Sequence, residues 1–338
     1  MNALAQVIPA DVAPTDEAEL ERQLEGLMLT LVSGERFERL CAIVHEHLFT
    51  GAPKPRGRMA FAATQALGLD ESLQVGWAAA CAVIHSASLI HDDIQDGSRY
   101  RRGGYSVWVR HGWAQAINAG DLLLMLPNIA IDHLDVDVAV RWSLALATSQ
   151  HAVDTVRGQS MEMCLASSRR RDWATYSEAV EKKTSAMFAL PVHGAALLAG
   201  WSEERAERAA RRFVRIGLLR QLAAELSDLY GDSDRRGAYV REGRISGLVV
   251  EHLEREGLDS IGPILAKDAE ATTNDDVRAF AATLERSGAR AAVQARMARI
   301  ATELREDEAL SKEPSLRAVA IASADAIVAS VAELPSRR

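Results

Sequence analysis

The strongest constraint on this chain is an apolar helical run from Ala78 to Ile90 that ends directly in three carboxylates. These carboxylates are Asp92, Asp93 and Asp96. Residues three and four apart share one face of a helix, so the three side chains can converge on one small volume. A solvated acidic helix end is the plain alternative. The long apolar run that precedes the carboxylates argues against it.

The composition around these carboxylates predicts a site for metal and phosphate. Three anions held so close repel one another unless a cation lies between them. Carboxylate oxygens suit a hard ion such as Mg²⁺, which keeps positions open for phosphate oxygens. Two adjacent arginines, Arg101 and Arg102, follow a few residues later and offer planar donors for a polyphosphate.

The rest of the chain predicts an all-α fold. Beyond residue 16, apolar positions recur at three- and four-residue spacing, and no convincing strand pattern appears. We expect a flexible lead over residues 1–15 and one domain over 16–338, a helical bundle around a central cavity. The expected helices cover 16–33, 35–49, 56–67, 72–93, 112–126, 135–166, 171–199, 203–230, 237–255, 259–267, 274–305 and 314–332.

Composition excludes several classes of protein. With 48% hydrophobic and 25% charged residues, a full core is available and global disorder is excluded. A net charge of −8 argues against a nucleic-acid binder. The three cysteines, Cys41, Cys81 and Cys164, have no metal-type spacing, which fits a reducing cytoplasm. We see no secretory signal and no long uncharged apolar run, so we expect a cytoplasmic protein without a membrane span.

The segment from His91 to Asp121, HDDIQDGSRYRRGGYSVWVRHGWAQAINAGD, resembles the first aspartate-rich region of the trans-isoprenyl diphosphate synthases, the all-α polyprenyl synthetase family. The resemblance implies that Mg²⁺ ions bridge Asp92, Asp93 and Asp96 to the diphosphate of an allylic substrate. Ionisation would leave an allylic carbocation, which the double bond of isopentenyl diphosphate attacks. This chemistry belongs to isoprenoid and terpene biosynthesis.

The resemblance also assigns the second substrate, isopentenyl diphosphate. His85 lies two turns before Asp92 and would contact that diphosphate, although a core histidine is the plain alternative. Residues 51–58 occupy the place of the family's basic loop and would supply Lys54 and Arg56, with Pro53 where the leading lysine usually stands. A basic surface loop is the other interpretation.

Three further elements follow in the order that the family requires. In the arginine pair, Arg101 would face the allylic diphosphate and Arg102 the isopentenyl diphosphate. Residues 157–162 resemble the family's GQxxD element, with Glu162 replacing aspartate, so Gln159 would lie near the metals or the allylic group. Lys183 and Thr184 resemble its Lys-Thr pair, which implies that Lys183 binds the allylic diphosphate.

The second aspartate-rich region departs from the family pattern. Gln221 is in register, but Ala224 removes the first carboxylate. Glu225 and Asp228 remain, three residues apart on one helical face, and could still hold a cation. Residues 243–247 replace what is commonly a lysine-rich stretch. Loss of one ligand would weaken a metal that stabilises the departing diphosphate.

Small residues near the first aspartate bear on product length. In the family, bulky aromatics four or five residues before this aspartate stop chain growth early. Here the positions hold Ser88 and Ala87, with Ile84 and Cys81 further along the same face. The space permits a product longer than fifteen carbons, about twenty carbons or more, because each added prenyl unit needs apolar volume.

Three functions remain open at this point. The first is a Mg²⁺-dependent head-to-tail prenyltransferase. The second is a terpene cyclase or a transferase with a changed acceptor, favoured by the altered second region. The third is a non-catalytic subunit of a heteromeric prenyl synthase. A homodimer is expected by resemblance, with Trp108 and Trp113 as candidates for its surface or for buried packing.

Overall fold

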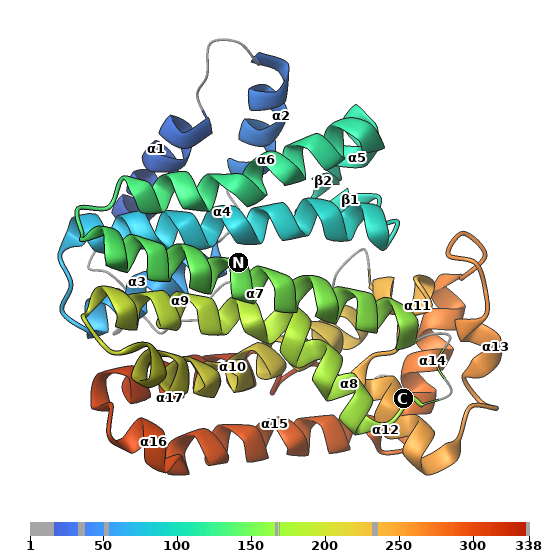
Figure 1. The fold of residues 1–338 in the computed structure, drawn as a ribbon. Helices are drawn as coiled ribbons and strands as arrows, with labels where there is room; N and C mark the ends of the chain where they lie inside the picture. Colours follow the sequence, from blue (N-terminus) through green and yellow to red (C-terminus); the bar gives the residue numbers. More distant parts are fainter. Residues whose placement is uncertain are drawn as a thin grey trace.

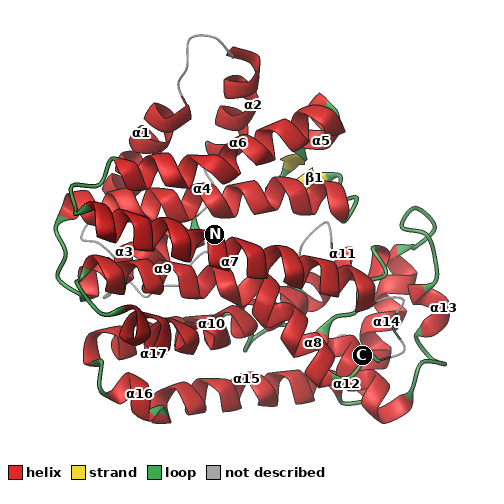
Figure 2. Cartoon of the chain, viewed as in Figure 1, coloured by secondary structure: helices red, strands yellow, loops and turns green. Residues whose placement is uncertain are grey.

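The computed structural model describes residues 17–32, 38–50, 54–165, 168, 170–231 and 236–335. The lead expected over residues 1–15 lies outside them. Within the described ranges nearly all regular structure is helical, which confirms the all-α prediction (Figures 1 and 2). The one sheet among these residues is a two-stranded antiparallel hairpin of two residues per strand, which the sequence did not predict.

The described elements, in chain order, are α1 (Glu17–Val32), α2 (Glu38–Leu48), α3 (Pro55–Ala66), α4 (Glu71–Gln95), β1 (Tyr100–Arg101), β2 (Gly104–Tyr105), α5 (Val107–His111), α6 (Trp113–Asp132), α7 (Val138–Leu165), α8 (Trp173–Val180), the π-helical segment η2 (Glu181–Ser185), α9 (Ala186–Leu198), α10 (Glu203–Tyr230), α11 (Ala238–Arg241), α12 (Gly247–Glu256), α13 (Gly262–Leu265), α14 (Asn274–Arg286), α15 (Ala289–Glu306), α16 (Glu308–Ser311) and α17 (Pro314–Ala329).

The long helices run side by side in layers, with α4 and α6 above α7 and α9, and α10 and α17 below them (Figure 1). Helix α4 packs against α3, α6 and α9, so most of its alanine-rich middle is buried. Alanine and glycine let these helices approach closely. At Gly194 of α9 a Cβ would lie 2.0 Å from the indole ring of Trp77, whose Nε1 donates to the carbonyl oxygen of Pro191 at 2.8 Å.

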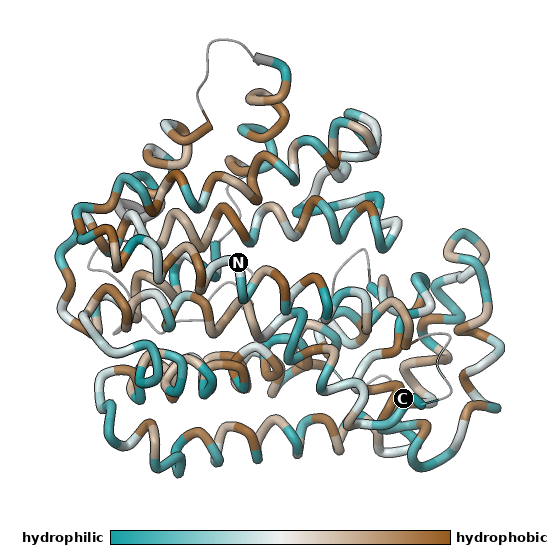
Figure 3. Tube along the Cα trace, viewed as in Figure 1, coloured by the Kyte–Doolittle hydropathy of each residue, from teal (hydrophilic) through white to brown (hydrophobic). Residues whose placement is uncertain are grey.

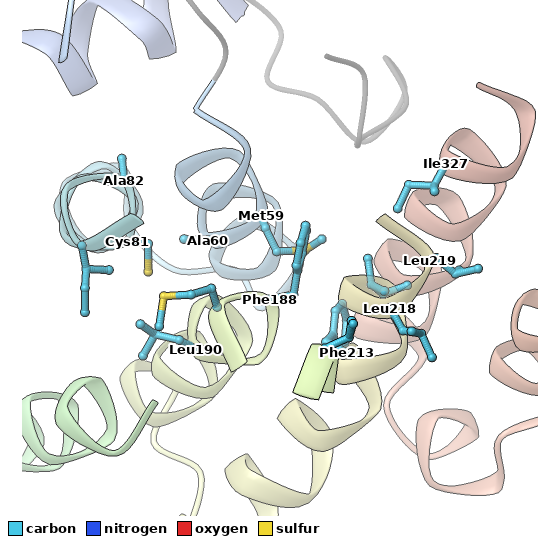
Figure 4. Packing of buried hydrophobic residues seen from close by; sticks show 14 of the residues in the cluster. Met59, Ala60, Cys81, Ala82, Phe188, Leu190, Phe213, Leu218, Leu219 and Ile327 are labelled. Atoms are coloured by element: carbon cyan, nitrogen blue, oxygen red, sulfur yellow. The ribbon is translucent and has the colours of Figure 1, made fainter. Parts of the chain in front are cut away.

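Apolar side chains fill the space between the layers. Residues from α3, α4, α9, α10 and α17 meet in one buried cluster, which includes Met59, Cys81, Phe188, Leu219 and Ile327 (Figure 4). Hydrophobic and hydrophilic stretches alternate along the long helices, the pattern of helices with one buried face (Figure 3). This packing fixes the C-terminal half of α4, and with it the carboxylates that end the helix.

Three expected helices are broken in the structure. The helix expected over 171–199 contains the π turn η2 between α8 and α9. The one expected over 237–255 is interrupted by a turn over residues 242–246. The one expected over 274–305 is broken between α14 and α15 at Gly288, whose φ of +76° a right-handed helix cannot contain. Helix α6 continues beyond the expected end at residue 126, through Pro127 to Asp132.

Two helices, α4 and α6, are long and apolar enough to cross a membrane by length and composition alone. Of the apolar window in α4, 72% is buried inside the bundle, which is typical of a core helix. The corresponding share for α6 is 44%. The absence of a membrane span therefore stays a prediction.

One face of the bundle remains apolar and exposed. It is formed by α6 and α7, and we call it the α6–α7 face. Its members are large hydrophobic side chains with at least 37% of their surface exposed: Trp113, Ile117, Met125, Ile129, Val138, Trp142, Leu146, Val153, Val156 and Met163. Trp113 thus belongs to an exposed surface, whereas Trp108 is half-buried and donates to the carbonyl oxygen of Ser98 at 2.9 Å.

Candidate functional site

A cavity of about 720 Å³ lies where the C-terminal end of α4 meets the hairpin, α7, η2, α10 and α11. We call it the polar cavity. Its lining contains two carboxylates and six side chains with a full positive charge. The lining residues are Thr50, Pro55, Arg56, His85, Ser88, Leu89, Asp92, Asp96, Arg101, Arg102, Thr155, Lys183, Thr184, Met187, Arg220, Gln221, Ala224, Tyr239 and Arg244. This excess of positive charge suits a strongly anionic ligand.

Asp92 and Asp96 provide the two carboxylates of the polar cavity. They are one turn apart on α4, so both side chains leave the same face. Burial raises the pKa of Asp92, and the nearby Asp96 carboxylate adds to the shift. Asp96 accepts a hydrogen bond from Nε2 of Gln159 at 3.2 Å. Two hard oxygen donors that repel each other fit a divalent cation such as Mg²⁺.

Asp93 does not join them, which corrects the expectation that all three carboxylates converge. Its carboxylate is 1% exposed and does not line the cavity. Instead it accepts three hydrogen bonds from Arg101, whose Nε lies 2.9 Å from Oδ1 and 3.2 Å from Oδ2 and whose Nη2 also donates to Oδ1. Consecutive residues of a helix diverge by about 100°, so Asp93 faces the hairpin while Asp92 faces the cavity. Asp93 therefore holds Arg101 in place.

Lys183 reaches the cavity from the π turn. Its Nζ lies 2.7 Å from Oε2 of Glu162, which also pairs with Arg244. Burial alone would raise the pKa of Glu162, but Arg244 and Lys183 outweigh it and lower this pKa to about 2. Isolated π turns often mark functional sites, since they shift the side chains that follow. The turn brings Lys183 and Thr184 to the cavity together.

A close backbone contact positions this π turn. At Gly158 of α7 a Cβ would lie 2.0 Å from the backbone nitrogen of Lys183 and 2.6 Å from the carbonyl carbon of Lys182. No side chain larger than hydrogen fits there. Gly158 therefore lets α7 and η2 approach closely enough for Glu162 and Lys183 to pair.

The other end of the polar cavity is cationic and holds His85, Arg56, Arg102 and Arg220. Arg56 is 8% exposed, and its guanidinium lies 3.9 Å above the ring centre of Phe188. Burial and the neighbouring Arg220 lower the pKa of Arg56 to about 9. Nε of Arg56 and Nη1 of Arg220 are buried without a hydrogen-bond partner among the described residues. Both groups can therefore donate to a bound anion.

His85 is neutral at this cationic end. Burial and the charges of Arg56 and Arg102 lower the pKa of His85 well below its ordinary value. The sequence prediction that His85 lies in the site is compatible with this position. A neutral imidazole has one N–H to donate and adds no further positive charge.

Lys54 lies outside the cavity, contrary to its predicted place in the basic loop. Its Nζ pairs with Oε1 of Glu25 at 3.1 Å, and the side chain is 3% exposed. Lys54 directly precedes α3, and Arg56 in the first turn of that helix points into the cavity instead. Pro53 lies outside the described residues.

Neither remaining carboxylate of the second region faces the cavity, which corrects their expected role as metal ligands. Glu225 is 3% exposed and accepts from the Tyr176 hydroxyl at 2.8 Å, Nε2 of Gln221 at 3.0 Å and the backbone N–H of Gly247 at 2.8 Å. Its oxygens therefore serve to join α10 to α8 and α12.

Asp228 is committed to the backbone in the same way. It accepts from the backbone N–H groups of Ala238 and Tyr239 at 3.1 and 3.2 Å, which begin α11. From the second region, Gln221 and Ala224 line the cavity, and neither side chain carries a charge. Among the described residues, no group of three Asp, Glu, His or Cys side chains is arranged to hold a metal by itself.

The position of Glu225 leads to a stability prediction. Burial outweighs its three hydrogen bonds and raises the pKa of Glu225 from 4.5 to about 7. The folded state then keeps a proton that the unfolded state has lost, so the free energy of unfolding falls as pH rises from about 4.5 to about 7. We expect Glu225→Gln to remove a decline on the order of 3 kcal/mol over this window. Urea unfolding of both proteins at several pH values measures it, and parallel pH curves would contradict it.

An apolar branch of about 340 Å³ adjoins the polar cavity and shares Ser88, Asp92, Thr155 and Met187 with it. Ile84, Leu124 and Val156 continue its wall between α4, α6 and α7. Ser88 thus lies where the two cavities meet. Ala87 lies in neither and is fully buried in the core, contrary to its expected place beside the product.

Sequence reasoning missed two cavity arginines, Arg220 and Arg244. Arg220 interrupts the run Leu218 to Leu222 on α10, and a charge inside an apolar run is a signal that could have found it. Arg244 lies in the segment where a lysine-rich stretch was expected. Only the turn before α12 brings it against Asp96 and Glu162.

Comparisons with known proteins agree with this architecture. A family model described as polyprenyl synthetase matches residues 38–283. The short chain isoprenyl diphosphate synthase of Methanothermobacter thermautotrophicus is 32% identical over 215 residues, which are 62% of this chain and 66% of that protein. The chain thus spans less than two thirds of the length of this relative. It spans 55% of the length of the short chain isoprenyl diphosphate synthase of Methanocaldococcus jannaschii.

Solved structures align over nearly their full length. Geranylgeranyl pyrophosphate synthetase from Geoglobus acetivorans has a TM-score of 0.79 and 23% identity over 92% of this chain and 98% of its own. Polyprenyl synthase from Caulobacter crescentus, complexed with calcium and isoprenyl diphosphate, has a TM-score of 0.76 and 25% identity over 92% and 95%. These likenesses show the shared fold.

Proposed function

Because the chain belongs to the polyprenyl synthetase family, we propose that it is a Mg²⁺-dependent prenyltransferase that extends an allylic diphosphate with isopentenyl diphosphate. One observation carries the proposal. The polar cavity combines a carboxylate pair with a group of cationic side chains, and it adjoins an apolar branch. Two diphosphates and one hydrocarbon tail match these three environments.

Each environment has a role in this proposal. Asp92 and Asp96 would hold Mg²⁺, which supplies charge stabilisation to the leaving diphosphate when bound. Lys183 and Arg101 reach the same region and donate to the diphosphate of the allylic substrate. The C–O bond of that substrate breaks, its terminal carbon bonds to the alkene of the isopentenyl group, and one proton and diphosphate are released.

The cationic end would bind the diphosphate of the acceptor. Arg56 and Arg220 have buried N–H groups without partners, and a bound diphosphate satisfies them. Neutral His85 contributes one further donor. Gln221 and Thr184 are hydrogen-bonded to each other at 3.3 Å and line the cavity between the two ends.

A product assay tests the proposal. Purified protein is incubated with Mg²⁺ and farnesyl or geranylgeranyl diphosphate, with and without isopentenyl diphosphate, and products are identified by mass spectrometry. A longer prenyl diphosphate is the expected result. Hydrocarbon or alcohol formed without isopentenyl diphosphate would indicate a cyclase instead. Lack of turnover with tight binding to another prenyl synthase would indicate a non-catalytic subunit.

The apolar branch predicts how product length can be changed. We propose a product of about twenty carbons or more, since the branch is open past Ser88. Ser88→Phe is expected to shorten the main product by at least one prenyl unit, because the ring fills the junction of the two cavities. Product chain lengths from wild type and variant, measured by mass spectrometry, provide the test.

Ala87 offers a matched comparison for this experiment. It is adjacent in sequence but fully buried outside both cavities, so Ala87→Phe should destabilise the fold by overpacking rather than select a shorter product. An unchanged product from Ser88→Phe would place the growing chain elsewhere.

We also propose that a second copy of the chain covers the α6–α7 face, and that the protein acts in the cytoplasm. Ten exposed large hydrophobic side chains on two neighbouring helices are unusual on a monomer, and two identical helical faces can pack against each other about a twofold axis. Sedimentation of the purified protein, with Trp142→Glu as the disrupting variant, tests this assembly.

A further inference from the structure

Arg244 lies at the point where three acidic side chains meet. Its Nη1 is 3.3 Å from Oδ2 of Asp96 and 3.4 Å from Oε2 of Glu242, and its Nη2 pairs closely with Glu162. The guanidinium also lies 4.4 Å from the ring centre of Tyr239. These contacts fix a positive charge beside Asp96, at the edge of the polar cavity.

The three carboxylates come from different parts of the chain. Asp96 ends α4, Glu162 lies on α7, and Glu242 follows α11, where it also accepts from the Ser98 hydroxyl at 2.9 Å. Three carboxylates so close would repel one another without a shared cation. Arg244 therefore performs here the charge neutralisation that a divalent metal performs in an acidic cluster.

Helix α10 provides no carboxylate that could bind a metal in the cavity. Ala224 has no donor atom, and Glu225 and Asp228, whose oxygens accept hydrogen bonds from protein groups, do not line the cavity as Asp92 and Asp96 do. A metal near Ala224 would also share the cavity with the positive charges of Arg244 and Lys183. The residues of the second aspartate-rich region thus do not fit a metal ion.

We infer that Arg244 takes the place of the metal that the second region would otherwise hold, so that all metal binding in the cavity depends on Asp92 and Asp96. This inference rests on the proposed function, which places diphosphate in the same cavity. A guanidinium donates two parallel hydrogen bonds to phosphate oxygens and cannot be removed by a chelator. The positive charge of Arg244 is then permanent, whereas the positive charge at Asp92 and Asp96 depends on a bound metal ion.

Counting bound Mn²⁺ by electron paramagnetic resonance tests the inference. The full chain is titrated with Mn²⁺ alone and with Mn²⁺ plus inorganic pyrophosphate. We expect Asp92→Asn to lose the pyrophosphate-dependent ions of the wild type, and Glu225→Gln to keep them all. A lower ion count in Glu225→Gln, at an unchanged melting temperature, would overturn the inference.

Arg244→Ala gives the sharper outcome. Removing the guanidinium leaves Asp96 and Glu242 without this cation and Glu162 with Lys183 alone, so side chains that are not arranged as a metal group while Arg244 is present become available to a divalent ion. We expect this variant to bind one additional Mn²⁺ without pyrophosphate. The added ion should disappear in the double variant Arg244→Ala, Glu162→Gln. Arg244→Lys keeps the positive charge and is the matched control, with the wild-type count.

The two hypotheses fail in different ways. If Arg244→Ala binds no more Mn²⁺ than the wild type, the inference about Arg244 is wrong, whatever the result of the product assay. If Asp92→Asn binds Mn²⁺ and pyrophosphate as the wild type does, the proposed function loses its metal site. In that case the inference, which assigns all cavity metal to Asp92 and Asp96, is overturned as well.

Discussion

Asp92→Asn is expected to lower kcat by about 10²–10³-fold, the effect of removing one strong electrostatic contribution to a transition state. Asparagine keeps the shape of the side chain but loses the charge that would hold Mg²⁺ against the departing diphosphate. The loss should appear in kcat because the stabilised charge develops only as the C–O bond breaks.

The same variant should leave the fold intact. The carboxylate of Asp92 forms no hydrogen bond or ion pair with the described residues, and burial disfavours its charge and raises the pKa of this carboxyl. Burial and the Asp96 charge outweigh the attraction of Asp92 to Lys183 and Arg101, so removing this charge should give a melting temperature equal to or above that of the wild type. Calorimetry and steady-state kinetics at saturating Mg²⁺ measure both quantities.

Asp132→Asn is a suitable control for this experiment. Asp132 is also at the end of a long helix, is 79% exposed and pairs with Arg141 at 3.4 Å, away from the cavity lining. The kcat of Asp132→Asn should equal that of the wild type. Wild-type turnover in Asp92→Asn would remove Asp92 from the mechanism and contradict the proposed metal site.

Gly158→Ala should have the second large effect. The added methyl group would lie 2.0 Å from a backbone nitrogen of the π turn, and backbone cannot rotate away as a flexible side chain can. Helix α7 and η2 must separate, which we expect to cost at least about 3 kcal/mol, at the upper end of overpacking effects. Lys183 would move with the turn, so the variant should lose both stability and activity.

Thermal unfolding together with the product assay checks this expectation. Gly26→Ala is the matched control, because a Cβ at Gly26 of α1 meets nothing within 4 Å and alanine favours a helix. That control should equal or exceed the wild-type melting temperature. A Gly158→Ala protein with unchanged melting temperature and turnover would show that α7 and η2 need not lie so close.

Much of the candidate site follows from local sequence pattern. The four-residue spacing of Asp92 and Asp96 sets them on one face of a helix, whatever surrounds it. His85 lies seven residues before Asp92, close to two full turns, so it shares that face as well. For these residues, knowing that the segment is helical is enough to predict which side chains lie together.

Predictions failed where a side chain had competing partners from elsewhere in the chain. Asp93 was grouped with its neighbours, but the hairpin brings Arg101 to it. Glu225 has the right spacing from Asp228, yet Tyr176 and the backbone of Gly247 occupy its oxygens. Spacing gives the direction in which a residue leaves its helix. It does not identify the groups from other helices that the side chain contacts.

The sequence by itself determined the helical class, the apolar helix that carries the aspartates and the order of the basic and acidic elements. These depend on periodicity and on contacts between residues a few positions apart. Only the tertiary structure decided which charges face the cavity and which are used to join helices. Arg244 and Asp96 are far apart in sequence and meet only after α4, α7 and the turn before α12 have packed. The energy of a buried charge depends on partners that are distant in sequence, so it cannot be predicted from a local sequence pattern.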